Sequence, residues 1–135
     1  MFKKLINTQL RPGIVNFGLL FLRLTIGGMM LTHGYSKFLK LLEGNLNFSD
    51  PLGIGSEISF LLVVLAEFFS AIALIFGLWT RINAFLLSFT MFVAAFIRHA
   101  DDIFSKQEKS LMYLAVFLFL MFVGGGKHSI DDRIY

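Results

Sequence analysis

Four apolar segments, two of them interrupted by a charged residue, constrain the fold of this chain more than any other feature. Together they cover more than half of the 135 residues. Arg23 lies inside the first segment and Glu67 inside the second. A charged side chain inside hydrocarbon costs roughly 2.5–3.5 kcal/mol on insertion scales, so such residues are rare and usually functional. We therefore expect helices that cross a membrane and enclose these two charges.

The composition supports integration into a membrane. Hydrophobic residues make up 56% of the chain and charged residues only 16%, whereas soluble domains contain about 45–50% apolar and about 25% charged residues. A soluble chain of this size could not cover so much apolar surface. No linker, repeat or low-complexity tract divides the chain, so we expect one domain over residues 1–135.

The sequence also narrows the chemistry that this chain can carry. It contains no cysteine, which excludes disulfides, thiolate metal ligands and haem attachment through a C-x-x-C-H motif. The net charge of +3 comes from scattered basic residues, so we expect no nucleic-acid partner. His33 and His99 could lie at similar depth as axial haem ligands, but no histidine or carboxylate pair has metal-site spacing. We therefore expect no metal site and do not favour a haem.

The apolar segments predict an all-α integral membrane protein, folded as an antiparallel four-helix bundle. A helix that crosses the ~30 Å hydrocarbon core needs about 20 residues. We expect helices over residues 14–38, 58–79, 82–97 and 111–123. The last two are short, so their ends would extend to Arg98, His99 or Lys109 at the membrane interface.

The distribution of lysine and arginine predicts the orientation of the helices. One membrane side would carry Lys3, Lys4, Arg11, Arg81, Lys127 and Arg133. The other side would carry Lys37, Lys40, Arg98, Lys106 and Lys109. Because residues that flank the first helix weigh most in the positive-inside rule, we expect both termini in the cytoplasm.

Arg23 and Glu67 each lie nine residues into an expected helix, counted from opposite membrane faces. On antiparallel neighbours this count places both near the midplane, so we expect an ion pair between them. The pair could fix the register of the two helices, or it could hold a ligand or carry protons. Removing one partner would leave a buried charge, at a cost of about 3–5 kcal/mol.

Further polar residues gather toward the outer end of the first helix. At about 100° per residue, Lys37 shares a face with Arg23, and His33 lies beside that face. His99 and Glu108 would reach the same end from the third and fourth helices. We expect a polar pocket that opens outward above Arg23 and Glu67. The alternative is that these side chains are solvated by lipid head groups.

In sequence order, these residues resemble the motifs of the DoxX family of small membrane proteins. Its opening motif, R-L-x-x-G…H-G-x-x-K, is similar to Arg23, Leu24, Gly27, His33, Gly34 and Lys37. Its E…G-L-x-T-R segment is similar to Glu67 followed by Gly77, Leu78, Trp79, Thr80 and Arg81. Its closing G-x-G-x-x-S-[LI]-D motif is similar to Gly124, Gly126, Ser129, Ile130 and Asp131.

The resemblance implies a four-helix bundle in the bacterial inner membrane. It also implies an association with quinone-linked or redox-stress oxidoreductases, without implying that this chain is itself an enzyme. The polar positions of the family correspond to Arg23, His33, Lys37, Glu67 and Asp131.

Three functions are compatible with these patterns. The first, which we favour, is a subunit or anchor of a quinone-linked oxidoreductase system, with a quinone in the polar pocket. Its partner would be a membrane or periplasmic oxidoreductase. The second is a small-molecule or ion transporter, built from further copies of the same chain. The third is a membrane scaffold or assembly factor, surrounded by the lipid bilayer, in which the buried charges are purely structural.

Overall fold

The structure is a computed structural model that describes residues 7–135. Within that range every regular element is helical, so the predicted all-α class is confirmed. The elements are α2 (Pro12–Leu42), α3 (Ser56–Val64), η1 (Leu65–Ser70), α4 (Ala71–Phe76), α5 (Thr80–Val93), η2 (Ala94–Arg98), α6 (Phe104–Val123) and α7 (Asp131–Ile134). The segments η1 and η2 are π-helical turns. Lys3 and Lys4, on which the predicted orientation partly depends, lie outside the described residues.

The first helix is longer than predicted. It begins at Pro12, whose fixed φ and missing N–H suit the first turn of a helix, and it runs for 31 residues. At 1.5 Å per residue this length is about 46 Å, well beyond a hydrocarbon core of ~30 Å. In a bilayer, α2 must therefore tilt or project into the interface.

The elements α3, η1 and α4 form one continuous rod of 21 residues. The rod ends three residues earlier than predicted, because Gly77 takes a left-handed conformation with a φ of 70°. The amide of Leu78 then donates to the carbonyl of Ala73 at 2.9 Å, which closes the helix with a Schellman motif. The next helix begins at Thr80, so only a short turn separates the two rods.

The remaining long segments extend beyond their predicted ends. The third runs continuously through α5 and η2, and α6 begins at Phe104 rather than near Leu111. Three of the described rods are long and apolar enough to cross a membrane, namely Pro12–Leu42, Ser56–Phe76 and Thr80–Arg98. The first turns of α6 carry three charges, on Lys106, Glu108 and Lys109, and α6 is not among these candidate spans.

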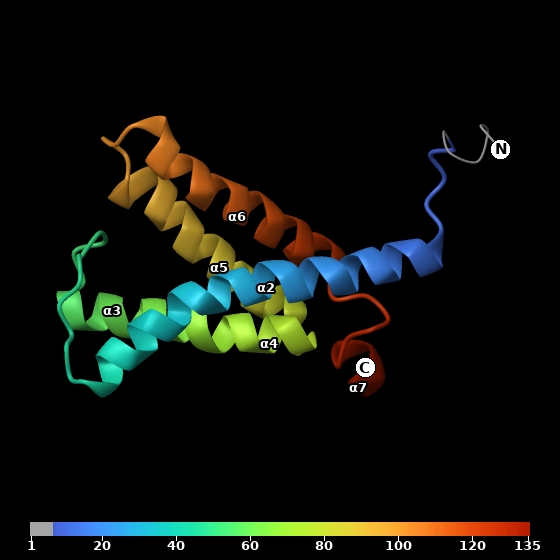
Figure 1. Ribbon diagram of the computed structural model, residues 1–135, viewed down its shortest axis with the longest axis horizontal. Helices are drawn as coiled ribbons and strands as arrows, with labels where there is room; N and C mark the ends of the chain where they lie inside the picture. The colour runs from blue at the N-terminus through green and yellow to red at the C-terminus, as the bar shows by residue number, and fades with distance from the viewer. Residues whose placement is uncertain (1–6) are drawn as a thin grey trace.

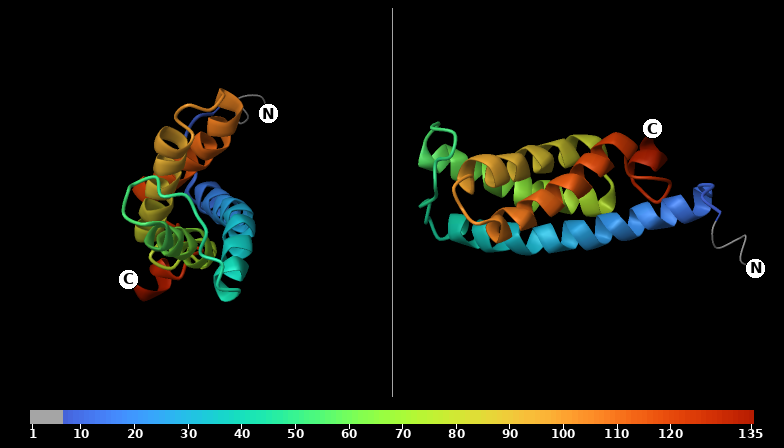
Figure 2. Two further views of the ribbon diagram at one scale, coloured as in Figure 1. Left: turned by 90° about the vertical axis from the view of Figure 1, so that its left-hand side faces the viewer. Right: turned by 90° about the horizontal axis from the view of Figure 1, so that it is seen from above.

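The long helices pack as two antiparallel pairs. One pair is α2 with the α3–η1–α4 rod, and the other is α5 with α6 (Figure 1). The pairs meet near the turn between α4 and α5 and lean apart toward the loop of residues 43–55 (Figure 2). The prediction of a single four-helix bundle is therefore not confirmed. The helices converge at one end of the molecule and diverge at the other.

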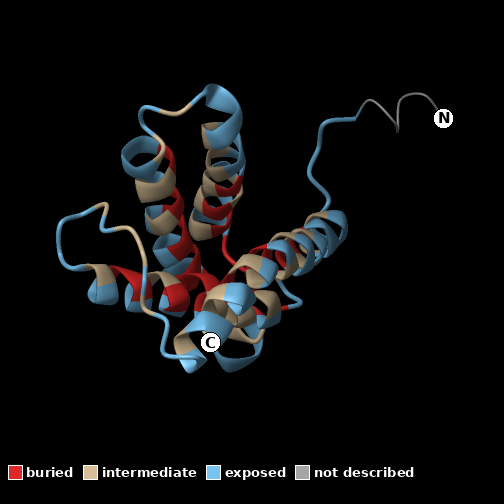
Figure 3. Ribbon diagram, turned by 60° about the vertical axis from the view of Figure 1, so that its left-hand side comes forward, coloured by how far each residue is buried: buried red, intermediate tan, exposed pale blue. Residues whose placement is uncertain are grey.

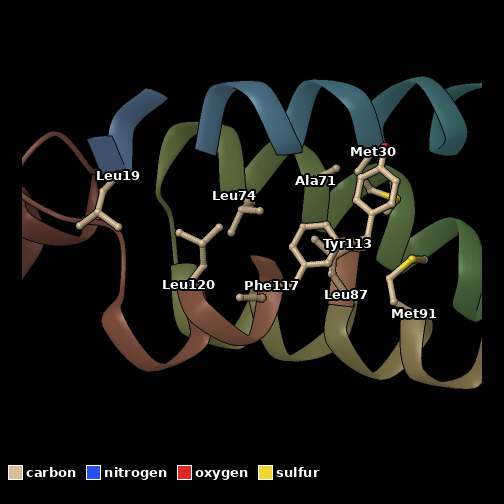
Figure 4. Packing of buried hydrophobic residues seen from close by; sticks show 10 residues of the cluster. Leu19, Met30, Ala71, Leu74, Leu87, Met91, Tyr113, Phe117 and Leu120 are labelled. Carbon is tan, nitrogen blue, oxygen red and sulfur yellow. The ribbon is translucent and has the colours of Figure 1, made fainter. Parts of the chain in front are cut away.

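An apolar core joins the two pairs. It contains Leu19, Met30, Ala71, Leu74, Ala84, Leu87, Met91, Tyr113, Phe117 and Leu120 (Figure 4). Figure 3 shows that buried residues follow the inner faces of the helices, whereas the outer faces are exposed. The outer faces carry large apolar side chains such as Phe21 and Phe85. Extensive exposed apolar surface of this kind is typical of contact with a membrane.

Candidate functional site

Arg23 is fully buried at the end of the molecule where the helix pairs meet. Its Nη1 donates to the carbonyl of Ile75 at 3.1 Å, and its Nη2 donates to the carbonyl of His128 at 2.6 Å. These contacts place the guanidinium at the C-terminal end of α4, where unpaired carbonyls carry partial negative charge. Arg23 therefore closes a helix end and holds the C-terminal tail against it.

The predicted ion pair between Arg23 and Glu67 is wrong. Among the residues that the structure describes, the ion-pair partner of Glu67 is Lys37. In the antiparallel pair, Gly34 faces the backbone of Glu67, whereas Arg23 faces Gly77. Glu67 and Gly77 are ten residues apart in sequence, which is about 15 Å along a helix. Counting residues from opposite helix ends misplaced the charges because α2 has 31 residues and continues far beyond Arg23.

The C-terminal tail folds back onto the turn between α4 and α5. The carboxylate of Asp131 accepts hydrogen bonds from the amides of Trp79 at 2.6 Å and Thr80 at 2.8 Å. These amides begin α5, so Asp131 caps that helix from a distant part of the chain. The hydroxyl of Ser129 donates to the carbonyl of Gly126 at 2.5 Å. The closing motif thus holds the tail in the position from which Asp131 reaches α5.

A second polar centre lies toward the other end of α2. The ammonium group of Lys37 forms an ion pair with the carboxylate of Glu67, which is buried within η1. The helices approach closely here: a Cβ atom on Gly34 would lie 2.3 Å from the carbonyl oxygen of Glu67. Single π-helical turns inside α-helices are rare and occur frequently at functional sites. Two of the predicted site residues, Lys37 and Glu67, are therefore brought together at an irregular turn.

The Lys37–Glu67 pair lies in the wall of a cavity of about 640 Å³. The cavity is bounded by α2, the loop of residues 43–55, the α3–η1 segment and the α5–η2 segment. Both π-helical turns contribute to it. Its charged and ionisable wall residues are Lys37, Glu67, Arg98 and His99, and most of the remaining wall is apolar.

Asp50 holds the loop of residues 43–55 that forms one wall of the cavity. Its carboxylate accepts hydrogen bonds from the amides of Ile54 at 3.0 Å and Gly55 at 2.9 Å, and from the hydroxyl of Ser59 at 3.0 Å. Hydrogen bonds to the charged form lower the pKa of Asp50 below its ordinary value, with the amide of Gly55 as the main cause. The loop is therefore fastened to the start of α3 by an ionised side chain.

His99 follows η2 and lies in the opposite part of the cavity wall. Its Nδ1 is 2.6 Å from Oδ2 of Asp102, and Gln107 of α6 donates to its backbone carbonyl at 2.6 Å. The hydrogen bond with His99 is the main reason why the pKa of Asp102 lies below its ordinary value. The imidazole is thus held by Asp102 of its own loop, and the backbone of His99 is held by the next helix.

The other predicted pocket residues lie outside this cavity. His33 packs edge-on against the ring of Tyr113, with 6.1 Å between ring centroids, and Glu108 is exposed on α6. Arg23 belongs to the polar centre at the opposite end of α2. Within residues 7–135, no cluster of histidine and carboxylate side chains is suited to hold a metal ion.

Sequence reasoning missed two groups of residues at this site. The first is Arg98, whose signal was its position next to His99 at the end of an apolar segment. The second is the loop of residues 43–55, which lies between the first two predicted helices and was not considered as part of a site. Its signal was Asp50 ahead of Gly53 and Gly55, a composition typical of an ordered turn that a side chain can cap.

The cavity has the chemistry to bind a small amphipathic molecule. An ammonium group has three N–H donors, so Lys37 retains donors beyond the one directed at Glu67. The cavity volume lies within the range of about 300–1,000 Å³ that is typical of small-molecule sites. A ligand could place a polar oxygen near Lys37 and its apolar body along the remaining wall.

Comparisons with known proteins agree with the membrane interpretation. The family model described as DoxX matches residues 18–100, which include Arg23, Lys37, Glu67 and His99. An uncharacterized protein of Haemophilus influenzae is 32% identical over 128 residues, which cover 87% of this chain and 90% of that protein. The inner membrane protein YqjF of Escherichia coli is 31% identical over 121 residues, which cover 84% of this chain and 89% of that protein. No solved structure gives a significant match.

These comparisons, together with the three candidate spans, identify a bacterial membrane protein. The family match covers more than half of the chain, and both relatives align over most of their length. The chain belongs to the DoxX family.

Proposed function

We propose that this protein is a membrane-embedded subunit of a quinone-linked oxidoreductase system, and that its cavity holds the quinone head group. The observation that carries the proposal is the Lys37–Glu67 pair in the wall of a mostly apolar cavity. A quinone needs hydrogen-bond donors for its carbonyl oxygens and an apolar slot for its ring. Lys37 supplies donors, and Glu67 balances the charge of Lys37 in a low-dielectric site.

The apolar part of the cavity wall suits a ligand that is dissolved in the bilayer. Leu62, Leu65 and Phe89 line the cavity, and each is about half exposed. Part of the apolar wall is therefore not covered by protein, and we infer that it opens toward lipid. An isoprenoid or alkyl tail could leave the cavity by this route while the head group remains at Lys37.

The electron-transfer centre would belong to a partner protein. This chain has no cysteine for thiol redox chemistry, and its run of three glycines follows α6 instead of opening a dinucleotide-binding turn. The resemblance to a family whose members accompany oxidoreductases also supports an electron-transfer centre in a partner protein. The chain would position the quinone for that partner within the membrane.

We also propose that both termini lie in the cytoplasm, which places the cavity at the periplasmic face. Lys37 supports this orientation because its charge is paired with Glu67 inside the protein and no longer counts as an outer flank. Fusions of a periplasmic phosphatase and of a fluorescent protein to the C-terminus test the orientation. Phosphatase activity without fluorescence would overturn it.

The transporter alternative requires a polar path along α2 from Arg23 to Lys37. The side chains between them belong to the apolar core, including Met30, Leu74 and Phe117, and all three are buried. The polar centres are therefore separated by a packed layer. This arrangement supports a binding site at one end of the molecule over a pathway through it.

Binding of a short-tailed quinone to the purified protein tests the proposed function. Decylubiquinone retained by protein-containing nanodiscs is compared with that retained by empty nanodiscs of the same lipid. We expect saturable binding that weakens at least tenfold in Lys37→Met, because the ligand loses a charged hydrogen-bond donor worth about 1.5–3 kcal/mol.

The matched control is Lys40→Met, since Lys40 is exposed on the same helix and does not line the cavity. The matched control for Glu67→Gln is Glu57→Gln, because the side chain of Glu57 is exposed at the start of α3. Retention equal to that of empty nanodiscs would overturn the proposal. So would equal losses in Lys37→Met and Lys40→Met.

A further inference from the structure

Of the three histidines, all of which lie in the described range, only His99 lines the cavity. Its position is set by two side chains: Asp102, 2.6 Å from Nδ1, and Gln107, which donates to its carbonyl. The side chains of His99 and Asp102 are 30% and 33% exposed. The imidazole is therefore oriented by the protein and still accessible to a ligand.

The contact with Asp102 determines which ring nitrogen carries the proton. A carboxylate that accepts a hydrogen bond from Nδ1 fixes the neutral imidazole with its proton on that atom. Asp102 can act as this acceptor at neutral pH because its pKa lies below the ordinary value. The other nitrogen, Nε2, then has a free lone pair, and among residues 7–135 it has no hydrogen-bond partner. In its neutral form, His99 thus offers the cavity a hydrogen-bond acceptor.

We propose that His99, positioned by Asp102, makes the cavity select hydroquinones over quinones. A hydroquinone has a hydroxyl group that can donate to Nε2, whereas the carbonyl oxygen of a quinone can only accept. Lys37 can donate to an oxygen of either form, so Lys37 supplies affinity and His99 supplies the discrimination. The inference rests on the proposed function, because it names the redox form that the same cavity prefers.

The charged groups around His99 differ from it in how they can contribute to the preference for hydroquinone over quinone. Arg98 is its neighbour in sequence, and Lys37 and Glu67 share the cavity wall. Arg98 and Lys37 only donate hydrogen bonds. Glu67 only accepts them, but its side chain is 6% exposed and is paired with Lys37. Lys106 of α6 acts on Asp102 and helps to keep that carboxyl ionised. Because the Glu67 side chain is largely buried and His99 is 30% exposed, the neutral imidazole is the more accessible group that distinguishes a donating oxygen from an accepting one.

The test compares the affinities of decylubiquinol and decylubiquinone for protein in nanodiscs, under anaerobic conditions at pH 8. We expect the wild-type protein to bind the hydroquinone roughly fivefold to tenfold more tightly, as one net hydrogen bond allows. A tenfold preference would raise the two-electron potential of the bound couple by about 30 mV. His99→Leu should reduce the ratio of the two affinities to about one, mainly through loss of hydroquinone affinity.

Variants of Asp102 separate positioning from a purely structural role. Asp102→Asn no longer fixes the tautomer, so the ratio should fall severalfold, and Asp102→Glu should restore it by returning a carboxylate. The matched control is Asp101→Asn, since Asp101 is the exposed neighbour of Asp102 and is not bonded to His99. A structural role would weaken both ligands equally and leave the ratio intact. If Asp102→Asn does not fold, His99→Leu decides the question alone.

The outcomes distinguish this inference from the proposed function. Wild-type protein that binds both forms through Lys37, but with equal affinity, would overturn the selection of hydroquinone and leave the proposed function standing. An unchanged ratio in His99→Leu would do the same. Wild-type protein that binds neither form would overturn both.

Discussion

The Nη1 atom of Arg23 lies 2.2 Å from the position that a Cβ atom would take on Gly77. Gly77 also has a positive φ of 70°, so two independent constraints favour glycine at this turn. The absence of a side chain lets a buried cation reach the last carbonyls of α4. The end of the molecule where the helix pairs meet thus depends on the contact between these two residues.

Gly77→Ala is therefore expected to destabilise the protein by about 2–3 kcal/mol, through strained backbone and displacement of Arg23. The control is Gly28→Ala in α2, where a Cβ atom meets nothing within 4 Å and φ is not positive. That change should stabilise the helix by about 0.5–1 kcal/mol. Thermal unfolding in detergent measures both variants. Equal shifts in Tm would contradict the geometry at Gly77.

A double-mutant cycle should show energetic coupling between Lys37 and Glu67 and none between Arg23 and Glu67. In the first pair, each single change leaves a charge without its partner. The double variant Lys37→Met/Glu67→Gln should therefore lose at least about 1 kcal/mol less free energy of unfolding than the two single variants lose when their losses are added. Distant sites add to within about 0.3–0.5 kcal/mol, so Arg23→Met and Glu67→Gln should be additive. The free energies of unfolding of the single and double variants, measured in detergent, distinguish coupling from additivity. Coupling of Arg23 with Glu67 would restore the pairing that was predicted from the sequence.

Asp131→Ala should destabilise the start of α5, because the amides of Trp79 and Thr80 lose their acceptor. Loss of a helix cap typically costs about 0.5–2 kcal/mol. Asp132→Ala is the matched control, since Asp132 is the adjacent exposed carboxylate. Amide hydrogen exchange at Trp79 and Thr80 should accelerate only in Asp131→Ala. Comparable acceleration in both variants would show that the cap is not specific to Asp131.

The loop of residues 43–55 should lose stability in acid through protonation of Asp50. The pKa of Asp50 in the folded protein lies below that of the unfolded chain. The contribution of this carboxylate is therefore fully present above the unfolded pKa of about 3.9 and is lost as pH falls through the folded value. Exchange at the amides of Ile54 and Gly55, corrected for its intrinsic pH dependence, should rise over that interval. Asp50→Asn should remove most of this pH dependence, and an unchanged profile would contradict the role of Asp50.

Local sequence properties determined the helical class and the approximate positions of the long helices. Apolar runs act within a few residues of themselves, so they can be recognised without knowledge of the fold. The predicted bounds nevertheless missed the helix start at Pro12 and the helix end at Gly77. The same local information placed Lys37, Glu67 and His99 among the candidate residues. All three line one cavity.

Tertiary structure decided which of these residues meet. Arg23 bonds to the carbonyls of Ile75 and His128, which lie 52 and 105 residues away in sequence, and neither carbonyl has a side-chain signature. Likewise, no sequence pattern marked η1 as a π-helical turn. Periodicity shows which side chains share one face of a helix, but contact with another helix depends on the register between the two. Here that register follows from the close approach of Gly34 to the backbone of Glu67, a packing constraint that no single helix contains.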